Sequence, residues 1–188
     1  ERGLKLSLEG RQAQGKGGHF EGLDKSPVQT NYFGREFRAA DAFGRLRQKG
    51  VYPGIDIVYY GKGQTLEYDF ELAPGADPSQ IRMRFEGADT IALGQQGQVI
   101  LGLGDRQVTQ NPPVVYQRGS NRGKSNREIV KVPCAYGMEA DGSIGIRLGS
   151  YDASQALVVD PTILFAGYLS GTSADVPIGI AHDKNGLI

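Results

Sequence analysis

The sequence predicts an all-β protein, an antiparallel sandwich or barrel-like set of sheets with about a dozen short strands and little or no helix. Two observations lead to this prediction. Short runs in which apolar and polar residues alternate, as they do in half-buried strands, recur along the chain. The 188 residues also include 28 Gly and 9 Pro, so glycine occurs at about twice its average frequency. Short strands separated by frequent turn signals are typical of sandwiches and barrels.

The clearest strands lie on either side of a loop at residues 73–80. Apolar and charged residues alternate with a period of two in residues 66–72 and again in residues 81–85. The loop between them holds two prolines and a glycine, so neither strand can continue through it. The pattern therefore predicts a β-hairpin.

The outward face of this predicted hairpin would carry a ladder of opposite charges. If the two strands pair symmetrically about the loop, Glu71 faces Arg82 and Asp69 faces Arg84. Each exposed pair contributes only about 0.2–1 kcal/mol, so we expect the ladder to set the register more than the stability. The apolar side chains of the inward face contribute roughly 1.5–3 kcal/mol each on burial, and they dominate the folding energy.

The rest of the chain is interpreted by the same pattern. Residues 4–8 alternate and predict an opening strand, whereas residues 10–26 are rich in glycine and polar residues and predict a mobile loop. Residues 35–49 fit both helical spacing and strand alternation, and we favour a strand. Residues 118–127 are predicted to form a polar hairpin tip. Further strands are predicted at residues 55–60, 90–93, 99–103, 106–109, 114–116, 129–138, 144–148, 157–159 and 163–169.

The composition argues against several classes of function. Lys plus Arg equals Asp plus Glu at 21 each, and this neutrality does not favour nucleic acid or anionic lipid as a partner. The single Cys134 cannot form an internal disulfide, and we interpret it as a small buried residue. No apolar run approaches the roughly 20 residues of a membrane span, and no segment has the features of a signal peptide. We expect no cofactor, no metal, no nucleic-acid partner and no insertion into a membrane.

Four segments carry a resemblance to a known family. They are VYPGIDIVYYG at 51–61, LEYDFELAPGADPSQIRMRFEGAD at 66–89, NPPVVYQ at 111–117 and GSYDASQALVVDPTILFAGYLSG at 149–171. Together they resemble a bacterial surface-protein domain of unknown function that precedes SBBP-type β-propeller repeats. Residues 1–29 match it only loosely.

The resemblance implies a division of the chain. Residues 1–161 would form the all-β module, and residues 162–188 would form a linker and the truncated start of the first propeller repeat. The chain opens on Glu1 and not on Met, so we expect it to be a processed or excised piece. The parent protein would be exported and multi-domain, at the cell envelope or outside the cell. The family brings no known catalytic residues with it.

These features predict a non-enzymatic structural or interaction module that caps or docks onto the adjoining propeller. A terminal repeat needs such a cap because its strand edges and apolar faces are otherwise unpaired. A glycan or another surface protein is a further candidate partner. The first alternative is therefore a carbohydrate-binding module.

The second alternative is a retaining glycosidase. Glu67, Asp69 and Glu71 form an E-x-D-x-E string similar to that of laminarinase-like β-sandwich enzymes. A retaining mechanism needs carboxyl groups about 5–5.5 Å apart, but residues four apart on a strand have Cα atoms about 13 Å apart. The arginines of the predicted ladder would also lower the carboxylate pKa values, whereas a general acid needs one raised. We interpret the string as a solvated, salt-bridged strand face.

Overall fold

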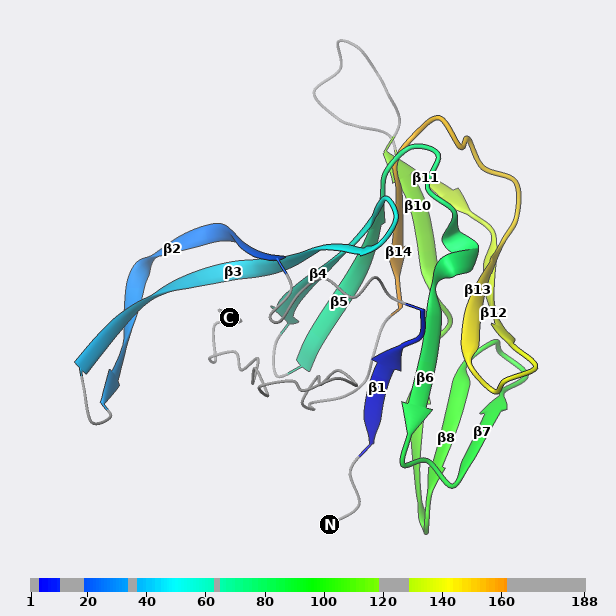
Figure 1. Ribbon diagram of the computed structural model, residues 1–188. Helices are drawn as coiled ribbons and strands as arrows, with labels where there is room; N and C mark the ends of the chain where they lie inside the picture. The colour runs from blue at the N-terminus through cyan, green and yellow to red at the C-terminus, as the bar shows by residue number, and fades with distance from the viewer. Residues whose placement is uncertain (1–3, 11–18, 34–36, 63–64, 119–128, 162–188) are drawn as a thin grey trace.

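The computed structural model describes residues 4–10, 19–33, 37–62, 65–118 and 129–161. In these ranges the chain forms fourteen β-strands and one short 3₁₀ helix, arranged as three antiparallel sheets (Figure 1). The predicted all-β class is confirmed. No sheet in the described part closes into a barrel, so the sandwich is the form that the chain adopts.

The largest sheet has seven strands in the order β11-β10-β14-β5-β4-β3-β2. Its members are β2 (His19–Phe33), β3 (Phe37–Tyr52), β4 (Ile55–Lys62), β5 (Thr65–Leu72), β10 (Val114–Arg118), β11 (Ile129–Val132) and β14 (Leu157–Asp160).

A four-stranded and a three-stranded sheet complete the fold. The four-stranded sheet has the order β1-β6-β13-β12, and the three-stranded sheet the order β7-β8-β9. Their members are β1 (Lys5–Leu8), β6 (Arg82–Glu86), β12 (Cys134–Met138), β13 (Ile144–Leu148), β7 (Thr90–Leu93), β8 (Val99–Leu103) and β9 (Arg106–Gln110).

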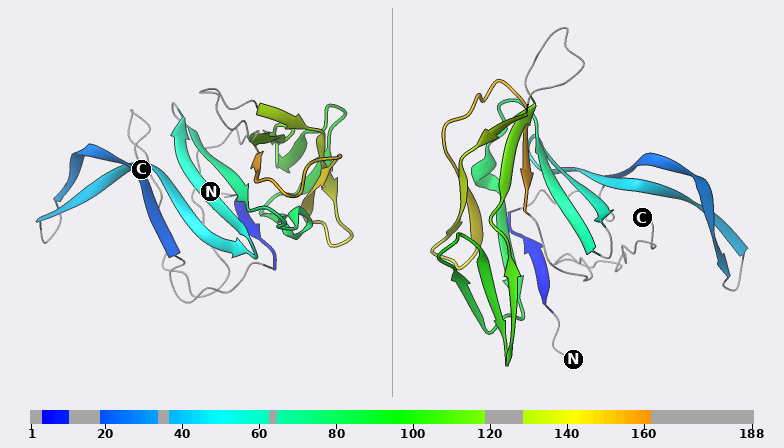
Figure 2. Two further views of the ribbon diagram at one scale, coloured as in Figure 1. Left: turned by 90° about the horizontal axis from the view of Figure 1, so that it is seen from above. Right: turned by 180° about the vertical axis from the view of Figure 1, so that it is seen from behind.

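The hydrophobic core draws side chains from all three sheets. Tyr68, Phe70 and Leu72 of β5 are buried, as their alternation predicts. They share one cluster with Met83 of β6 and Leu101 of β8. The four-stranded and seven-stranded sheets therefore pack as the two layers of a sandwich (Figure 2).

The predicted hairpin at residues 66–85 is wrong. β5 pairs with β4 and β14, whereas β6 pairs with β1 and β13. The proline-containing loop carries a 3₁₀ helix, Pro78–Gln80, which Asp77 caps by accepting a hydrogen bond from the Ser79 amide at 2.9 Å. The loop thus takes the chain from one layer to the other, and it does not turn it back within a sheet.

Two further predictions concern the N-terminal third of the chain. The strand favoured at residues 35–49 is confirmed, because β3 spans Phe37–Tyr52. The mobile loop predicted at residues 10–26 is wrong over its second half, because β2 begins at His19. The predicted tip at 118–127 lies outside the described residues except at its first position, and residues 162–188 lie wholly outside them.

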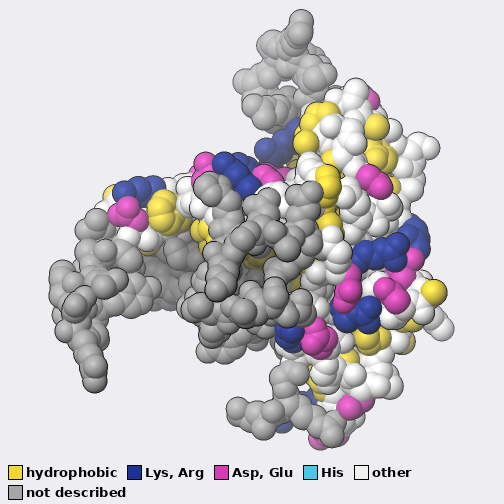
Figure 3. Space-filling view, in the orientation of Figure 1, with side chains coloured by type: hydrophobic (Ala, Val, Ile, Leu, Met, Phe, Trp, Pro, Cys, Tyr) yellow, Lys and Arg dark blue, Asp and Glu magenta, His cyan; other side chains and the backbone are white. Residues whose placement is uncertain are grey.

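β2 and β3 form a ribbon that extends beyond the sheet. β3 starts to pair with β4 only at Arg45, so among the described strands residues 24–33 and 37–44 pair only with each other. We call these residues the arm, and it projects from the body in each view (Figures 1 and 2). Near its base, Asp24 pairs with Arg45 at 2.6 Å and Lys25 with Asp41 at 2.6 Å. Opposite charges lie side by side on this surface (Figure 3).

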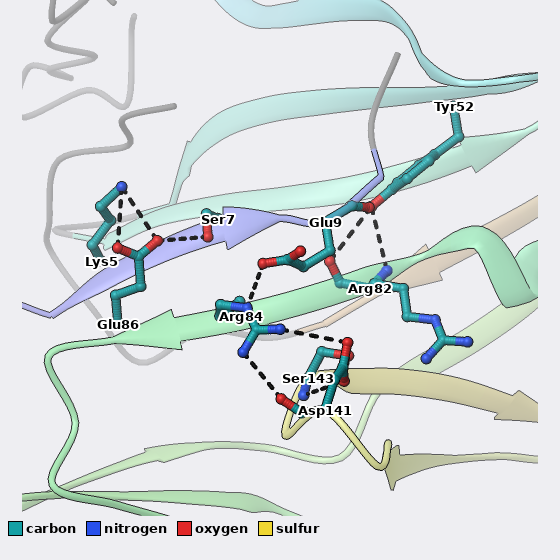
Figure 4. Close-up of polar contacts among 9 residues, drawn as sticks. All are labelled: Lys5, Ser7, Glu9, Tyr52, Arg82, Arg84, Glu86, Asp141 and Ser143. Atoms are coloured by element: carbon teal, nitrogen blue, oxygen red, sulfur yellow. Dashed lines mark hydrogen bonds and ion pairs between the residues drawn. The ribbon is translucent and has the colours of Figure 1, made fainter. Parts of the chain in front are cut away.

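Tyr52 joins the two layers through its hydroxyl group. The side chain is 1% exposed, and its hydroxyl donates to the Glu9 carbonyl at 2.8 Å and accepts from the Arg82 amide at 3.3 Å (Figure 4). One phenol of the seven-stranded sheet therefore satisfies a backbone group that follows β1 and one at the start of β6 in the four-stranded sheet.

Replacing Tyr52 with phenylalanine is expected to lower the free energy of unfolding by about 0.5–1.5 kcal/mol, because backbone groups lose their buried partner. Urea unfolding followed by circular dichroism would measure this loss. Tyr116→Phe is the control, since no described group bonds to the Tyr116 hydroxyl. Equal stability of the two variants would contradict the proposed link between the layers.

Candidate functional site

The three acidic residues singled out from the sequence share one face of β5. Glu67, Asp69 and Glu71 point away from the core, because the intervening side chains of β5 are buried in it. In the register of the sheet they lie opposite Tyr60, Val58 and Asp56 of β4, respectively. The row of carboxylates therefore lies on the outer face of the seven-stranded sheet.

Glu71 is held by an arginine that the sequence did not indicate. Its Oε2 accepts a hydrogen bond from the Arg47 guanidinium of β3 at 2.7 Å. The same guanidinium lies 3.6 Å from Glu21 and 3.8 Å from Asp56. Both members of the Arg47–Glu71 pair are less than one-third exposed, so water screens this pair less than a surface pair.

The arginines of the predicted ladder lie in the other layer. On β6, Arg84 pairs with Glu9 and with Asp141, whose Oδ2 is 3.4 Å away (Figure 4). Arg82 pairs with Glu139 at 3.0 Å. The ladder Glu71–Arg82 and Asp69–Arg84 therefore does not form. Glu71 on β5 does form a salt bridge, but its partner is Arg47 on β3 and not an arginine of β6.

Asp69 has a pKa raised to about 6. Partial burial is the main cause, and the neighbouring carboxylate of Asp160 on β14 adds to it. The Tyr60 hydroxyl donates to Asp69 at 3.0 Å and opposes the shift. Burial and the Asp69 charge in turn raise the pKa of Tyr60. The expected lowering by arginines is thus reversed at this residue, which can hold a proton close to neutral pH.

A hollow of about 590 Å³ opens beside Glu71. Its polar walls include Arg47, Asp56, Glu71 and Arg118, and its apolar walls include Val158. Asp56 is the cross-strand neighbour of Glu71 and also accepts a hydrogen bond from the Gly50 amide at 2.8 Å. The two carboxylates of the hollow are therefore occupied by protein donors, with the Arg47 guanidinium close to both.

The hollow does not assemble the E-x-D-x-E string. Among the described residues, Glu71 lines it, but Glu67 and Asp69 do not. Glu67 is only 5% exposed. The acid with the raised pKa and the open hollow are therefore separate. The two carboxylates that do line the hollow, Asp56 and Glu71, both lie close to the Arg47 guanidinium.

Four residues of this face were not predicted from the sequence. Arg47, Asp56, Tyr60 and Asp160 all contribute to it through contacts between strands. For Asp56 and Tyr60 a signal existed, since both alternate with the buried Ile55, Ile57 and Tyr59 on β4. For Arg47 and Asp160, no local sequence pattern indicated that they would lie beside the acidic residues of β5.

Other candidate chemistry is limited in the described part of the chain. No group of three or more His, Cys, Asp or Glu side chains there could hold a metal ion. The Cys134 thiol is partly buried, donates to the Pro113 carbonyl at 3.0 Å, and has a pKa raised by burial. No helix in the described ranges has the length and apolarity needed to cross a membrane.

Comparison with known families places most of the chain in a family. Residues 2–162 match the family model described as a domain of unknown function, DUF7948. Searches of curated proteins and of solved structures found no match. The prediction that the chain contains a domain of unknown function is therefore confirmed.

Proposed function

The chain belongs to the DUF7948 family, a domain of unknown function, and we propose that it is a non-enzymatic structural module that docks onto the domain following it. In this proposal the parent is an exported bacterial surface protein, and the following domain is an SBBP-type β-propeller. The resemblance of residues 162–188 to a linker and the start of such a repeat supports a propeller as the partner. The module would cover strand edges that a terminal repeat leaves unpaired.

One observation carries the non-enzymatic part of the proposal. Several described charged groups on the outer faces of both layers bond to protein groups, as Glu71 does to Arg47, Asp69 to Tyr60 and Arg84 to Glu9. Groups engaged in this way fix the register of strands, and this engagement supports a structural role over an enzymatic one.

The docking is tested by joining this chain to the domain that follows it in the parent polypeptide. The rotational correlation time from NMR relaxation should then match one rigid body of the combined mass, because the two domains pack against each other. Ile129→Asp, on the far edge of the seven-stranded sheet, is the control that should leave the result unchanged. Independent tumbling of the two domains would overturn the proposal.

The raised pKa of Asp69 is the one observation that favours the glycosidase alternative, since a general acid needs it. We expect β-glucan hydrolysis by the chain to equal that of buffer alone, and the double variant with Glu67→Gln and Glu71→Gln to give the same rate. A reducing-sugar assay measures both. Hydrolysis by the unmodified chain that the double variant loses would replace the structural proposal by an enzymatic one.

The carbohydrate-binding alternative rests on the hollow beside Glu71, whose arginines and carboxylates could bond to sugar hydroxyls. A glycan array separates it from the structural proposal. We expect no binding at micromolar strength, because no described aromatic side chain lines the hollow as a stacking surface. Binding that Arg118→Ala abolishes would support the alternative.

A further inference from the structure

The hollow beside Glu71 lies over β14, between two strands that carry longer side chains. β14 has β5 on one side and β10 on the other (Figure 1). Val158 of β14 lies opposite Glu71 in the register of the sheet, and Ala156, two residues earlier, also lines the hollow. Arg118 of β10 comes two residues after Tyr116, the partner of Val158, and therefore shares this face. The small side chains near β14 thus form a floor between charged walls.

The wall on the β5 side has an excess of negative charge. The Arg47 guanidinium lies within 3.8 Å of three carboxylates, those of Glu21, Asp56 and Glu71. Lys49 pairs with Glu21 at 3.0 Å. Among the described residues that ion pairs join at this wall, three carboxylates therefore meet two cations. A carboxylate offers about four acceptor positions, so Asp56 and Glu71 can still accept hydrogen bonds from a further cation.

The wall on the β10 side carries a cation. Arg118 is exposed, and no described group forms an ion pair with it. Arg45, the other arginine near Glu71, bonds to Asp24 at 2.6 Å and is not among the described residues that line the hollow. Arg118 is therefore the cation of the hollow that is open to an anionic group.

The two charged walls are too far apart for one compact ion to meet both. Neighbouring strands lie about 4.8 Å apart, so β14 separates the backbones of β5 and β10 by about 10 Å. The floor between the walls is apolar, with Ala156 and Val158. The hollow has a volume of about 590 Å³, within the range of roughly 300–1,000 Å³ that small-molecule sites occupy. A ligand with opposite charges at its two ends and an apolar middle fits this arrangement.

We propose that the hollow binds a zwitterion whose ammonium and carboxylate groups are separated by a short apolar chain. The ligand's carboxylate pairs with Arg118, and its ammonium group pairs with Asp56 and Glu71. Its methylene groups pack on Ala156 and Val158. A lysine at the carboxyl end of a polypeptide has this chemistry, and so does a free ω-amino acid. The site adds a binding activity to the module and does not depend on docking to the following domain.

Isothermal titration calorimetry of the 188-residue chain tests this inference with four probes. Nα-acetyl-lysine represents the polypeptide end, and 6-aminohexanoate represents the free ω-amino acid. Nα-acetyl-lysine amide and hexanoate each keep one of the two charges. We expect a dissociation constant of about 1 mM for the tighter zwitterion, which identifies the source. The probes with one charge should bind about tenfold more weakly or less, because each leaves one wall unpaired.

Two variants each remove the charge of one wall. Arg118→Ala and Asp56→Asn should both weaken the binding of the tighter zwitterion by about tenfold or more. Asparagine can still accept the hydrogen bond from the Gly50 amide, so the fold should be kept. Lys131→Ala is the control, because Lys131 is an exposed cation of the same sheet and is not among the described residues that line the hollow. All three variants should melt near the unmodified chain.

Several results would overturn the inference. Hexanoate that binds as tightly as the zwitterions would make the hollow a site for simple anions, and equal binding of the amide would make it a site for simple cations. Binding that survives Arg118→Ala, or that Lys131→Ala weakens to the same extent, would place the ligand elsewhere. The absence of heat from either zwitterion at about 10 mM would show that the hollow does not take this class of ligand.

Discussion

Replacing Phe70 with alanine is expected to lower the free energy of unfolding by about 3–5 kcal/mol, the largest effect of any change considered. Phe70 is fully buried on β5 between Ile57 and Val159, and its ring meets that of Tyr68 edge-on with centroids 5.6 Å apart. Truncation removes the ring from the centre of the sandwich and leaves a cavity that neighbouring strands cannot fill. Thermal unfolding should show a melting temperature lower by about 10 °C.

The control for this prediction is an apolar side chain outside the core. Leu93 on β7 is 40% exposed, and Leu93→Ala should change the stability by less than about 0.5 kcal/mol. Phe70→Leu keeps most of the volume and should cost less than the alanine change. A loss below about 1 kcal/mol for Phe70→Ala would contradict a core in which the two layers meet at this ring.

Alternation along one strand predicts which side chains are buried, because it depends only on neighbours in the sequence. Tyr68, Phe70 and Leu72 are buried for that reason. The pattern does not select a partner strand, since β5 would alternate equally well beside any neighbour. One of its two actual neighbours, β4, directly precedes it, but the other, β14, comes from the far end of the described chain.

The loop between β5 and β6 shows why the hairpin prediction failed. Two prolines and a glycine end a strand whether the chain turns back in one sheet or crosses to another layer. Here Gly75 has a φ of 77° and Asp77 caps a 3₁₀ helix, and the chain crosses. Turn chemistry is local, whereas the choice of layer depends on where the core can be closed.

The beginning of β2 was not predicted as a strand, because its residues have little apolar alternation. Gly22 suggested a loop, but a Cβ at this position would lie 2.4 Å from the Phe43 ring, so the close packing of the ring requires glycine there. Charge pairs across the ribbon replace apolar burial further along. None of these features is visible before β2 is aligned with β3.

Replacing Asp69 with asparagine is expected to raise the free energy of unfolding by about 2 kcal/mol at pH 7.5. The folded pKa of about 6 exceeds the ordinary value of 3.8, so between these values the folded protein holds a proton that the unfolded chain has released. Stability from this proton is complete below pH 3.8 and is lost as the pH rises through 6. The full shift corresponds to about 3 kcal/mol, which partial exposure of Asp69 reduces.

Asparagine removes the charge that burial and Asp160 oppose, and its amide oxygen can still accept the hydrogen bond from Tyr60. The gain over the unmodified chain should therefore be largest above pH 7 and should shrink toward pH 4, where Asp69 is already protonated in the fold. Urea unfolding at pH 4.5, 6 and 7.5 measures this trend. Asp105→Asn removes the same charge from an exposed turn and is the control, which should change the free energy of unfolding by less than about 0.5 kcal/mol. A gain that is constant with pH would show that Asp69 keeps an ordinary pKa and that Asp160 does not act on it.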